Sequence, residues 1–94
     1  MVDRACDAET EETIRGLVLG QEGVLGIDRL MTRLFGAKIY VDMEIAADGS
    51  RTLYETHAIA ERVHDAIEEH FPEVKHCMVH VNPASCGPDK DMER

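Results

Sequence analysis

The segment Ala37 to Ala47, AKIYVDMEIAA, constrains the fold more than any other part of this chain, because its apolar and polar residues alternate cleanly. A period of two residues is that of a β-strand with one buried face. One side of the strand carries Ile39, Val41, Met43 and Ile45, and the other carries Lys38, Tyr40, Asp42 and Glu44. The chain must therefore cover one face of a sheet with apolar side chains, and the other face must meet water or a partner.

A helix and a further strand are predicted before this segment. The apolar residues Ile14, Leu17 and Val18 recur at helical spacing in a helix that begins near Ala8. The segment Val24 to Phe35 is interpreted as a strand, although its alternation is imperfect. A glycine turn separates it from the next strand, so the two strands should form an antiparallel hairpin.

A long helix and a last strand are predicted after the hairpin. Thr52 and Glu55 have the spacing of a capping box that begins the helix, and Phe71 followed by Pro72 ends it. The apolar residues expected on or beside one helix face are Leu53, Ile59, Ala60, Val63, Ala66 and Ile67. The last strand, which runs to Pro83, should turn Cys77, Val79 and Val81 inward and His76, Met78, His80 and Asn82 outward.

This order of elements predicts an α+β domain in which two helices pack on one face of a small, three-stranded mixed sheet. Residues 9–83 should form the domain, with a flexible segment at 1–8 and a flexible tail at 84–94. The uncovered face of the sheet should carry Tyr40, Asp42, Met78, His80 and Asn82. Either water or a second copy of the chain must cover that face.

The formal net charge of −9, from 19 acidic and 10 basic residues, restricts the partners. Nucleic acids and anionic membrane surfaces repel such a chain, so neither nucleic-acid binding nor direct lipid binding is expected. Cations or basic proteins are the natural partners. No apolar run approaches the roughly 20 residues that a membrane-spanning helix needs.

The cysteines and the missing catalytic motifs argue against a disulfide scaffold and against an enzyme. The three cysteines are widely spaced, which fits a reducing compartment. Cys77 is expected to be a small buried residue, and Cys86 an exposed thiol or an additional soft ligand. The sequence contains no glycine-rich phosphate loop, no nucleophile elbow and no triad-like order of Ser, His and Asp.

All five histidines lie in the last helix and the last strand. His57, Glu61 and His64 share one side of the helix, a spacing that chelates divalent ions but that also describes an ordinary solvated flank. Asp42 and His80 lie on the outward side of their strands. If they converge with His57, the three residues make a mixed nitrogen and oxygen site suited to Zn²⁺ and other first-row divalent ions. Solvent-exposed histidines without a ligand role are the alternative that spacing alone favours.

The stretch from the first helix to Pro83 resembles the cytoplasmic C-terminal domain of the cation diffusion facilitator, or cation efflux, family. The features that carry the resemblance are "GV" opening the first strand, Arg33 and Gly36 near the hairpin, the alternating second strand, "THAIAERV" and the closing "VHVNP". The resemblance implies a ferredoxin-like, metallochaperone-like α-β-β-α-β fold and a two-fold homodimer. It also implies cytoplasmic metal binding that is coupled to transport by a separate membrane domain.

The resemblance also implies a ligand set. The family's helix histidine falls on His57, its last-strand histidine on His80, its second-strand ligand on Asp42 and a first-strand position on Asp28. The family's bridging carboxylate falls on Asn82, and a neutral amide cannot hold two cations together as a carboxylate does. One mixed Asp/His site per subunit is therefore expected in place of a two-metal cluster. Harder cations such as Mn²⁺ or Fe²⁺ fit such a site better than they fit an all-histidine site.

The resulting hypothesis is a cytoplasmic regulatory domain of a zinc-type, divalent-cation efflux transporter in the inner or plasma membrane. Metal would bind at a dimer cleft and couple closure of the cleft to transport. Zinc is favoured, with manganese, iron and cadmium as alternatives. The expected partners are a second copy, the transmembrane domain of the parent transporter and the cations themselves. The alternatives are a stand-alone metal-binding protein or chaperone and a ferredoxin-like dimerisation module with incidental histidines.

Overall fold

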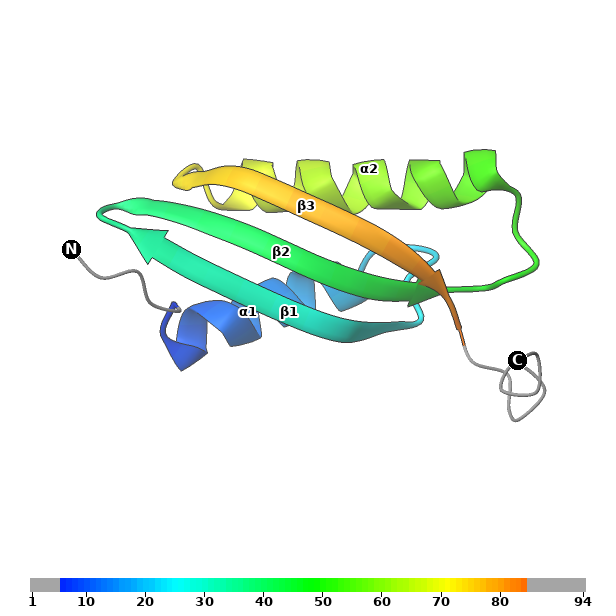
Figure 1. The fold of residues 1–94 in the computed structure, drawn as a ribbon, viewed down its shortest axis with the longest axis horizontal. Helices are drawn as coiled ribbons and strands as arrows, with labels where there is room; N and C mark the ends of the chain where they lie inside the picture. The colour runs from blue at the N-terminus through cyan, green and yellow to red at the C-terminus, as the bar shows by residue number, and fades with distance from the viewer. Residues whose placement is uncertain (1–5, 85–94) are drawn as a thin grey trace.

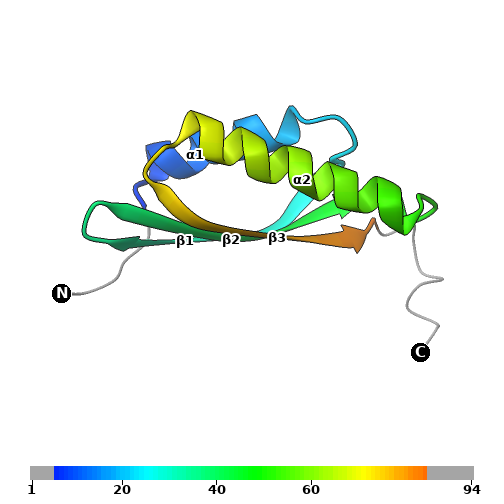
Figure 2. The same ribbon diagram turned by 90° about the horizontal axis from the view of Figure 1, so that it is seen from above.

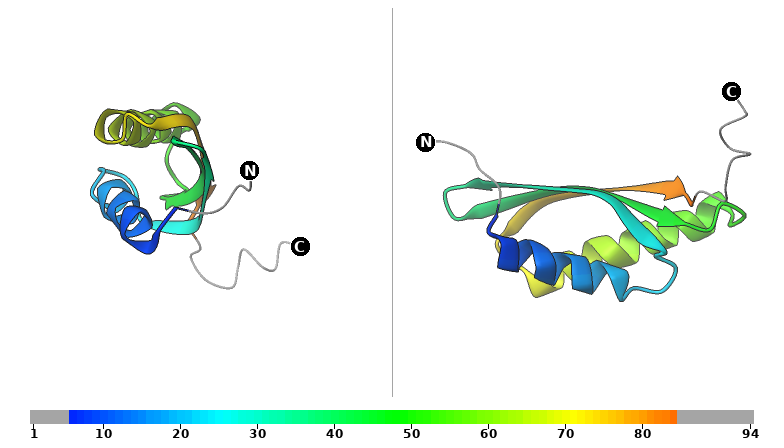
Figure 3. Two further views of the ribbon diagram at one scale, coloured as in Figure 1. Left: turned by 90° about the vertical axis from the view of Figure 1, so that its left-hand side faces the viewer. Right: turned by 90° about the horizontal axis from the view of Figure 1, so that it is seen from below.

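Two helices and a three-stranded sheet make up the fold, and the computed structural model describes residues 6–84. In chain order the elements are α1 (Ala8–Leu19), β1 (Gly26–Phe35), β2 (Lys38–Ala47), α2 (Leu53–His70) and β3 (Val74–Pro83) (Figure 1). Both helices lie on the same side of the sheet when it is seen edge-on (Figure 2). The view along the strands shows the same two layers (Figure 3). The predicted α-β-β-α-β, ferredoxin-like fold is confirmed.

β2 is the central strand of the sheet, antiparallel to β1 and parallel to β3. Its inward residues Val41, Met43 and Ile45 are each 0% exposed, and they pack in one cluster with the buried residues of both helices. Burying a side chain of this size stabilises the fold by roughly 1.5–3 kcal/mol relative to leaving it in water. The alternation of β2 therefore decides which face of the sheet the helices cover.

The start and end of α2 follow the prediction. The Thr52 hydroxyl accepts a hydrogen bond from the Glu55 N–H at 3.1 Å, and a Glu55 carboxylate oxygen accepts one from the Thr52 N–H at 3.0 Å. This is the predicted capping box. The helix ends at His70, immediately before Phe71 and Pro72.

The prediction for the apolar face of α2 is wrong at one residue, Leu53. Ile59, Val63 and Ile67 are buried as expected, but Leu53 is 85% exposed. Leu53 is the first residue of the helix, and it borders a surface hollow beside Pro83 instead of the core. Helical spacing alone could not show that the core ends before the first turn of α2.

The imperfect alternation of β1 comes from a β-bulge. Ile27 pairs with Ile45, but the next pair joins Arg29 to Glu44, so Asp28 is an extra residue between the two pairs. Such an insertion leaves one residue out of the ladder and changes the direction of its side chain. The bulge places Asp28 within reach of the uncovered face of the sheet.

Thr32 of β1 fastens the start of the described chain to the sheet. It is a polar residue of the core, only 4% exposed. Its hydroxyl accepts a hydrogen bond from the Cys6 N–H at 2.9 Å and donates one to a Glu11 carboxylate oxygen at 2.7 Å. A single side chain thus joins β1 to α1 and to the residue that precedes α1 by two positions.

The predicted flexible ends fall mostly beyond the part of the chain described. Residues 1–5 and 85–94, and Cys86 with them, lie outside the described residues. Neither of the two helices within residues 6–84 has both the length and the apolar composition needed to cross a membrane.

Replacing Thr32 with valine should destabilise the fold. Thr32→Val keeps the shape of the side chain but removes the partner of the Cys6 N–H and of Glu11, which should lower the free energy of unfolding by about 1–3 kcal/mol. Urea denaturation followed by circular dichroism measures the change. Thr13→Val is the control, because the exposed Thr13 hydroxyl donates to the Glu9 carbonyl within one helix. Equal losses for the two variants would contradict the role assigned to Thr32.

Candidate metal centre

The sheet face turned away from the helices carries polar, aromatic and thioether side chains in cross-strand rows. The register places Tyr40 between Arg33 and His76, Asp42 between Met31 and Met78, and Glu44 between Arg29 and His80. The outward residues of β2 and β3 alternate with buried or half-buried ones. The predicted composition of this face is confirmed: Tyr40, Asp42, Met78, His80 and Asn82.

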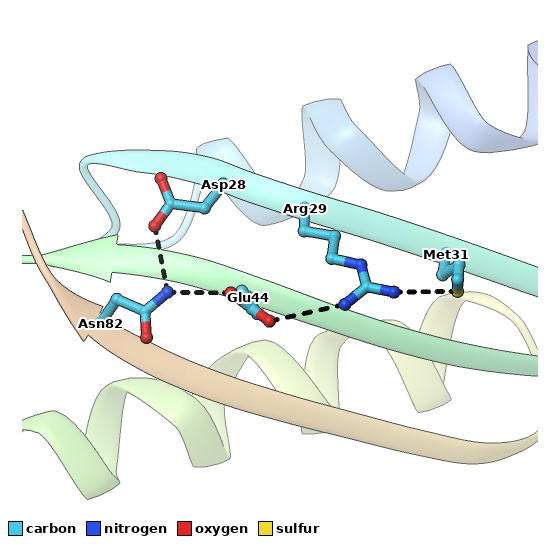
Figure 4. A network of polar contacts seen from close by, with 5 residues as sticks. All are labelled: Asp28, Arg29, Met31, Glu44 and Asn82. Atoms are coloured by element: carbon cyan, nitrogen blue, oxygen red, sulfur yellow. Dashed lines mark hydrogen bonds and ion pairs between the residues drawn. The ribbon is translucent and has the colours of Figure 1, made fainter.

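Three strands meet in a polar network at one end of this face (Figure 4). The Asn82 amide nitrogen donates one hydrogen bond to Asp28 Oδ2 and another to Glu44 Oε1, each 3.1 Å long. Asp28 comes from the bulge in β1, Glu44 from β2 and Asn82 from the end of β3. A single amide group therefore lies between two carboxylates from different strands.

Arg29 extends the network along β1. Its Nη1 lies 3.8 Å from Glu44 Oε2, and its Nη2 donates to the Met31 sulfur at 3.5 Å. The Arg29 side chain is 57% exposed and that of Glu44 is 35% exposed. One oxygen of Glu44 thus accepts from the Asn82 amide, while the other faces a permanent cation.

The structure does not bring the five predicted ligands together at one point. Asp28 and Asn82 are in direct contact. His80 lies opposite Glu44, whereas Asp42 lies one row further along β2 and borders a hollow of about 280 Å³. That hollow is lined by Met31, Arg33, Phe35, Tyr40, Val41, Asp42 and His76.

His57 stands apart from the other predicted ligands. It lies on α2, its side chain is 71% exposed, and its Nε2 is 3.5 Å from a Glu61 carboxylate oxygen. Because α2 packs on the covered face, one chain does not bring His57 together with Asp42 and His80. Among residues 6–84, no group of three or more His, Cys, Asp and Glu side chains is arranged to hold a metal ion. The three-residue site stays a prediction, and it requires a second copy of the chain.

Glu44 is the residue that sequence reasoning missed. Its alternation in β2 placed it on the same outward side as Asp42, two positions earlier, and that was the available signal. The sequence favoured Asp42 as the second-strand ligand, but Glu44 is the carboxylate that meets Asn82 beside Asp28. The choice between the two depends on the pairing of β2 with β3, which sets Asn82 opposite Ala46 and Met78 opposite Asp42.

The other histidines contact carboxylates or aromatic rings. His64 has one ring nitrogen 3.6 Å from an Asp65 oxygen and the other 3.5 Å from a Glu68 oxygen, on the solvated flank of α2. His70 lies edge-on against Phe71, with ring centroids 5.1 Å apart. Neither arrangement adds a ligand to the network on the sheet.

Cys77 is a half-buried thiol on the inner side of β3, in line with the expected small buried residue. Burial, together with the negative charges of Glu68 and Asp42, raises its pKa to about 11. A thiol with so high a pKa is protonated at neutral pH, which makes it a poor metal ligand.

The donor groups of the network are of the types that bind divalent cations in proteins. Asp28 Oδ2 and Glu44 Oε1 approach the same nitrogen atom, so both carboxylates already point to one place. Rotation of the Asn82 amide would exchange its nitrogen for its oxygen and offer a third oxygen donor. His80, opposite Glu44, adds an imidazole on the same face. Oxygen donors with one imidazole suit hard to borderline divalent ions.

The match to a family model decides what kind of domain this is. The model described as "Cation efflux protein, cytoplasmic domain" matches residues 6–84, the whole of the described chain. The chain belongs to the cation efflux family, as its cytoplasmic domain. Proteins of this family are transporters.

Three relatives of this cation efflux domain have names that refer to metals or to cations. Metal tolerance protein C1 of Arabidopsis thaliana is 36% identical over 84 residues, 89% of this chain and 18% of the relative. Cation-efflux pump FieF of Shigella flexneri is 31% identical over 88 residues, 94% of this chain and 29% of the pump. Manganese efflux system protein MneP of Bacillus subtilis is 26% identical over 83 residues, 88% of this chain and 28% of the relative. The cation efflux domain thus spans less than a third of the length of these relatives.

Solved structures share the fold of the cation efflux domain. A nickel form of a MamM CTD variant superposes with a TM-score of 0.81 at 24% identity, covering 84% of this chain and all of that chain. A further MamM-CTD structure gives a TM-score of 0.78 at 25% identity, covering 81% of this chain and 96% of that chain. These likenesses confirm the arrangement of helices and sheet.

The raised pKa of Cys77 in this cation efflux domain predicts slow alkylation. At pH 8 the thiolate of a thiol with a pKa of about 11 is roughly a hundredfold rarer than that of an unperturbed thiol of pKa 9.0. Iodoacetamide should therefore modify Cys77 about a hundredfold more slowly in the folded domain than in urea, as followed by peptide mass spectrometry. Equal rates in the two states would contradict the raised pKa.

The same shift gives a stability prediction at high pH. The folded state holds the Cys77 proton more tightly, so its contribution to stability is complete below the unfolded pKa of 9.0 and is lost as pH rises toward about 11. The free energy of unfolding should fall across this window, and Cys77→Ala should show a smaller fall than the parent.

Proposed function

We propose that this chain is the metal-responsive regulatory domain of a divalent-cation efflux transporter, which acts as a pair in the cytoplasm beneath an inner or plasma membrane. Membership of the cation efflux family supports the general role. The relatives named for manganese efflux and for cation efflux, and the nickel and copper forms among the similar structures, support divalent cations as the ligands. In this role the domain binds cations and catalyses no reaction.

The observation that carries the proposal is the position of the Asn82 amide between Asp28 and Glu44. Two carboxylates held at hydrogen-bonding distance from the same nitrogen repel each other and attract positive charge. In the chain alone, the polarised N–H bonds of a neutral amide supply that charge. A divalent cation supplies more charge to the same two carboxylates and draws their oxygens together.

The residues that would hold the cation come from three strands. Asp28, Glu44 and Asn82 offer oxygen donors, and His80 offers a nitrogen donor on the same face. Asp42 and the exposed His57 would complete the coordination from a second copy, since one chain does not bring them to this point. Zinc remains the cation expected from the family resemblance, and the carboxylate-rich set makes manganese its strongest rival.

Pairing through the uncovered face gives the cation a regulatory effect. Each chain carries a net charge of −9, so two chains repel each other when their uncovered faces approach. A cation bound between them lowers that repulsion and favours the closed pair. It shifts the equilibrium only by as much as it binds the closed form more tightly than the open form. In a complete transporter, the closed pair would alter the membrane helices to which it is joined.

A metal-independent dimerisation module is the second candidate. The specific observation in its favour is that residues 6–84 contain no group of three or more His, Cys, Asp and Glu side chains arranged for a metal. The exposed Phe35, Tyr40 and Met78 on the uncovered face would supply its contacts. Such a module would pair with the same affinity in the presence of a chelator.

The proposal predicts that metal binding depends on the two carboxylates of the network. Asp28→Asn combined with Glu44→Gln should weaken binding of Zn²⁺ and Mn²⁺ at least about tenfold, because ligand charge tunes cation affinity. Isothermal titration calorimetry measures the affinity, and small-angle scattering follows compaction of the pair. His57→Ala combined with His80→Ala should also weaken Zn²⁺ binding.

The matched control removes two carboxylates on the exposed flank of α2. Asp65→Asn combined with Glu69→Gln makes the same change in net charge at two exposed residues of the helix layer. This variant should bind both cations with an affinity within about threefold of the parent. Exposed charges that lie more than a Debye length from a binding site are largely screened from it. Equal weakening in the control and the network variant would contradict the assigned site.

A further inference from the structure

Arg29 occupies the side of the site that a cation would need. Its Nη1 lies 3.8 Å from Glu44 Oε2, and the other oxygen of Glu44 accepts from Asn82 at 3.1 Å. Figure 4 shows the guanidinium and the amide reaching Glu44 from different strands. Both oxygens of the central carboxylate are therefore engaged within the chain, one of them by a full positive charge.

The contacts of the Arg29 guanidinium are weak enough for it to move away from Glu44. Its Nη2 donates to the Met31 sulfur at 3.5 Å, a weak acceptor, and the Arg29 side chain is 57% exposed. An exposed ion pair of this kind contributes only about 0–1 kcal/mol. Arg29 thus neutralises Glu44 without locking it, and a stronger cation can displace the guanidinium into solvent.

We propose that Arg29 is a tethered competitor that determines which cations the site accepts and at what concentration. This inference rests on the proposed function, because it concerns the same carboxylates. A monovalent ion brings no more charge to Glu44 than the guanidinium that already lies beside it, and the guanidinium is attached to the protein. A divalent ion brings twice that charge and displaces it. Arginine keeps its charge throughout the physiological pH range, so the competition does not fade as pH rises.

Removing the competitor should tighten binding. In Arg29→Gln, a divalent ion no longer displaces a cation from Glu44 and no longer lies near its positive charge. The dissociation constants for Mn²⁺ and Zn²⁺ should fall about three- to tenfold at physiological ionic strength. Arg29→Lys restores a positive charge at the same position and should return the affinities toward those of the parent.

Arg33→Gln is the matched control. Arg33 lies on the same strand and the same face, opposite Tyr40 instead of Glu44. At about 3.3 Å per residue it is roughly 13 Å from Arg29 along the strand, which exceeds the Debye length of about 8 Å at physiological salt. The same loss of charge at Arg33 should change either dissociation constant by less than about twofold.

The experiment is a calorimetric titration of the full 94-residue chain and its variants with Mn²⁺ and with Zn²⁺, in buffers containing either Na⁺ or a bulky organic cation. Tighter binding by Arg29→Gln but not by Arg33→Gln supports the proposal, as does a loss of discrimination against Na⁺ confined to Arg29→Gln. Equal affinities of parent and Arg29→Gln, or equal gains in the two glutamine variants, would overturn it while leaving the proposed function intact.

The failure of the proposed function has a different signature. If neither the parent nor Arg29→Gln binds any divalent ion at millimolar concentration, both the function and the competition are wrong. If only Arg29→Gln binds, the competition is confirmed in its strongest form, with Arg29 excluding the cation from the isolated chain. Thermal unfolding of each variant without metal establishes that the affinities are compared between folded proteins.

Discussion

The sheet of this domain is covered on one face only, and the other features of the molecule follow from that constraint. Val41, Met43 and Ile45 fill the space beneath the two helices and have no exposed surface. Because side chains of a strand alternate, every second residue of β2 must then face away from the helices. The charged, aromatic and thioether residues of all three strands accumulate there in cross-strand rows. The polar side chains of the uncovered face thus lie there because the apolar residues between them are buried beneath the helices.

In the polar network on the uncovered face, each carboxylate has a hydrogen-bond donor or a cation of the same chain as its partner. Asn82 donates to Asp28 and Glu44, and Arg29 lies beside Glu44, so the two carboxylates are stabilised by groups of the same chain. In the proposed function, a cation would therefore compete for carboxylates that already have partners within the chain. Such an arrangement suits the proposed regulatory role, because the apo form must be stable if metal is to change its state. The amide at position 82 and the guanidinium at position 29 together give the site a default occupant.

The fold was largely predictable from sequence, but the geometry of the site was not. Alternation in β2 and the Thr52–Glu55 capping box are local patterns, and the structure confirms both. The partner of Asn82 depends on the register between β2 and β3, which pairs Asn82 with Ala46, two residues from Glu44 and four from Asp42, so Glu44 takes the place expected for Asp42. The predicted meeting of His57 with Asp42 and His80 would need a second chain, which no pattern within one sequence can place. Local sequence patterns therefore predicted the helices and strands, but they could not predict contacts between strands or between chains.

Anomalous X-ray diffraction from crystals grown with Mn²⁺ tests the central claim most directly, because it locates the cation without assuming its ligands. A manganese peak is expected on the uncovered face, bonded to Asp28 and Glu44, with the Arg29 guanidinium turned away from Glu44. Manganese bound only on α2 beside His57 and Glu61, with the Asn82 hydrogen bonds and the Arg29–Glu44 pair unchanged, would contradict it.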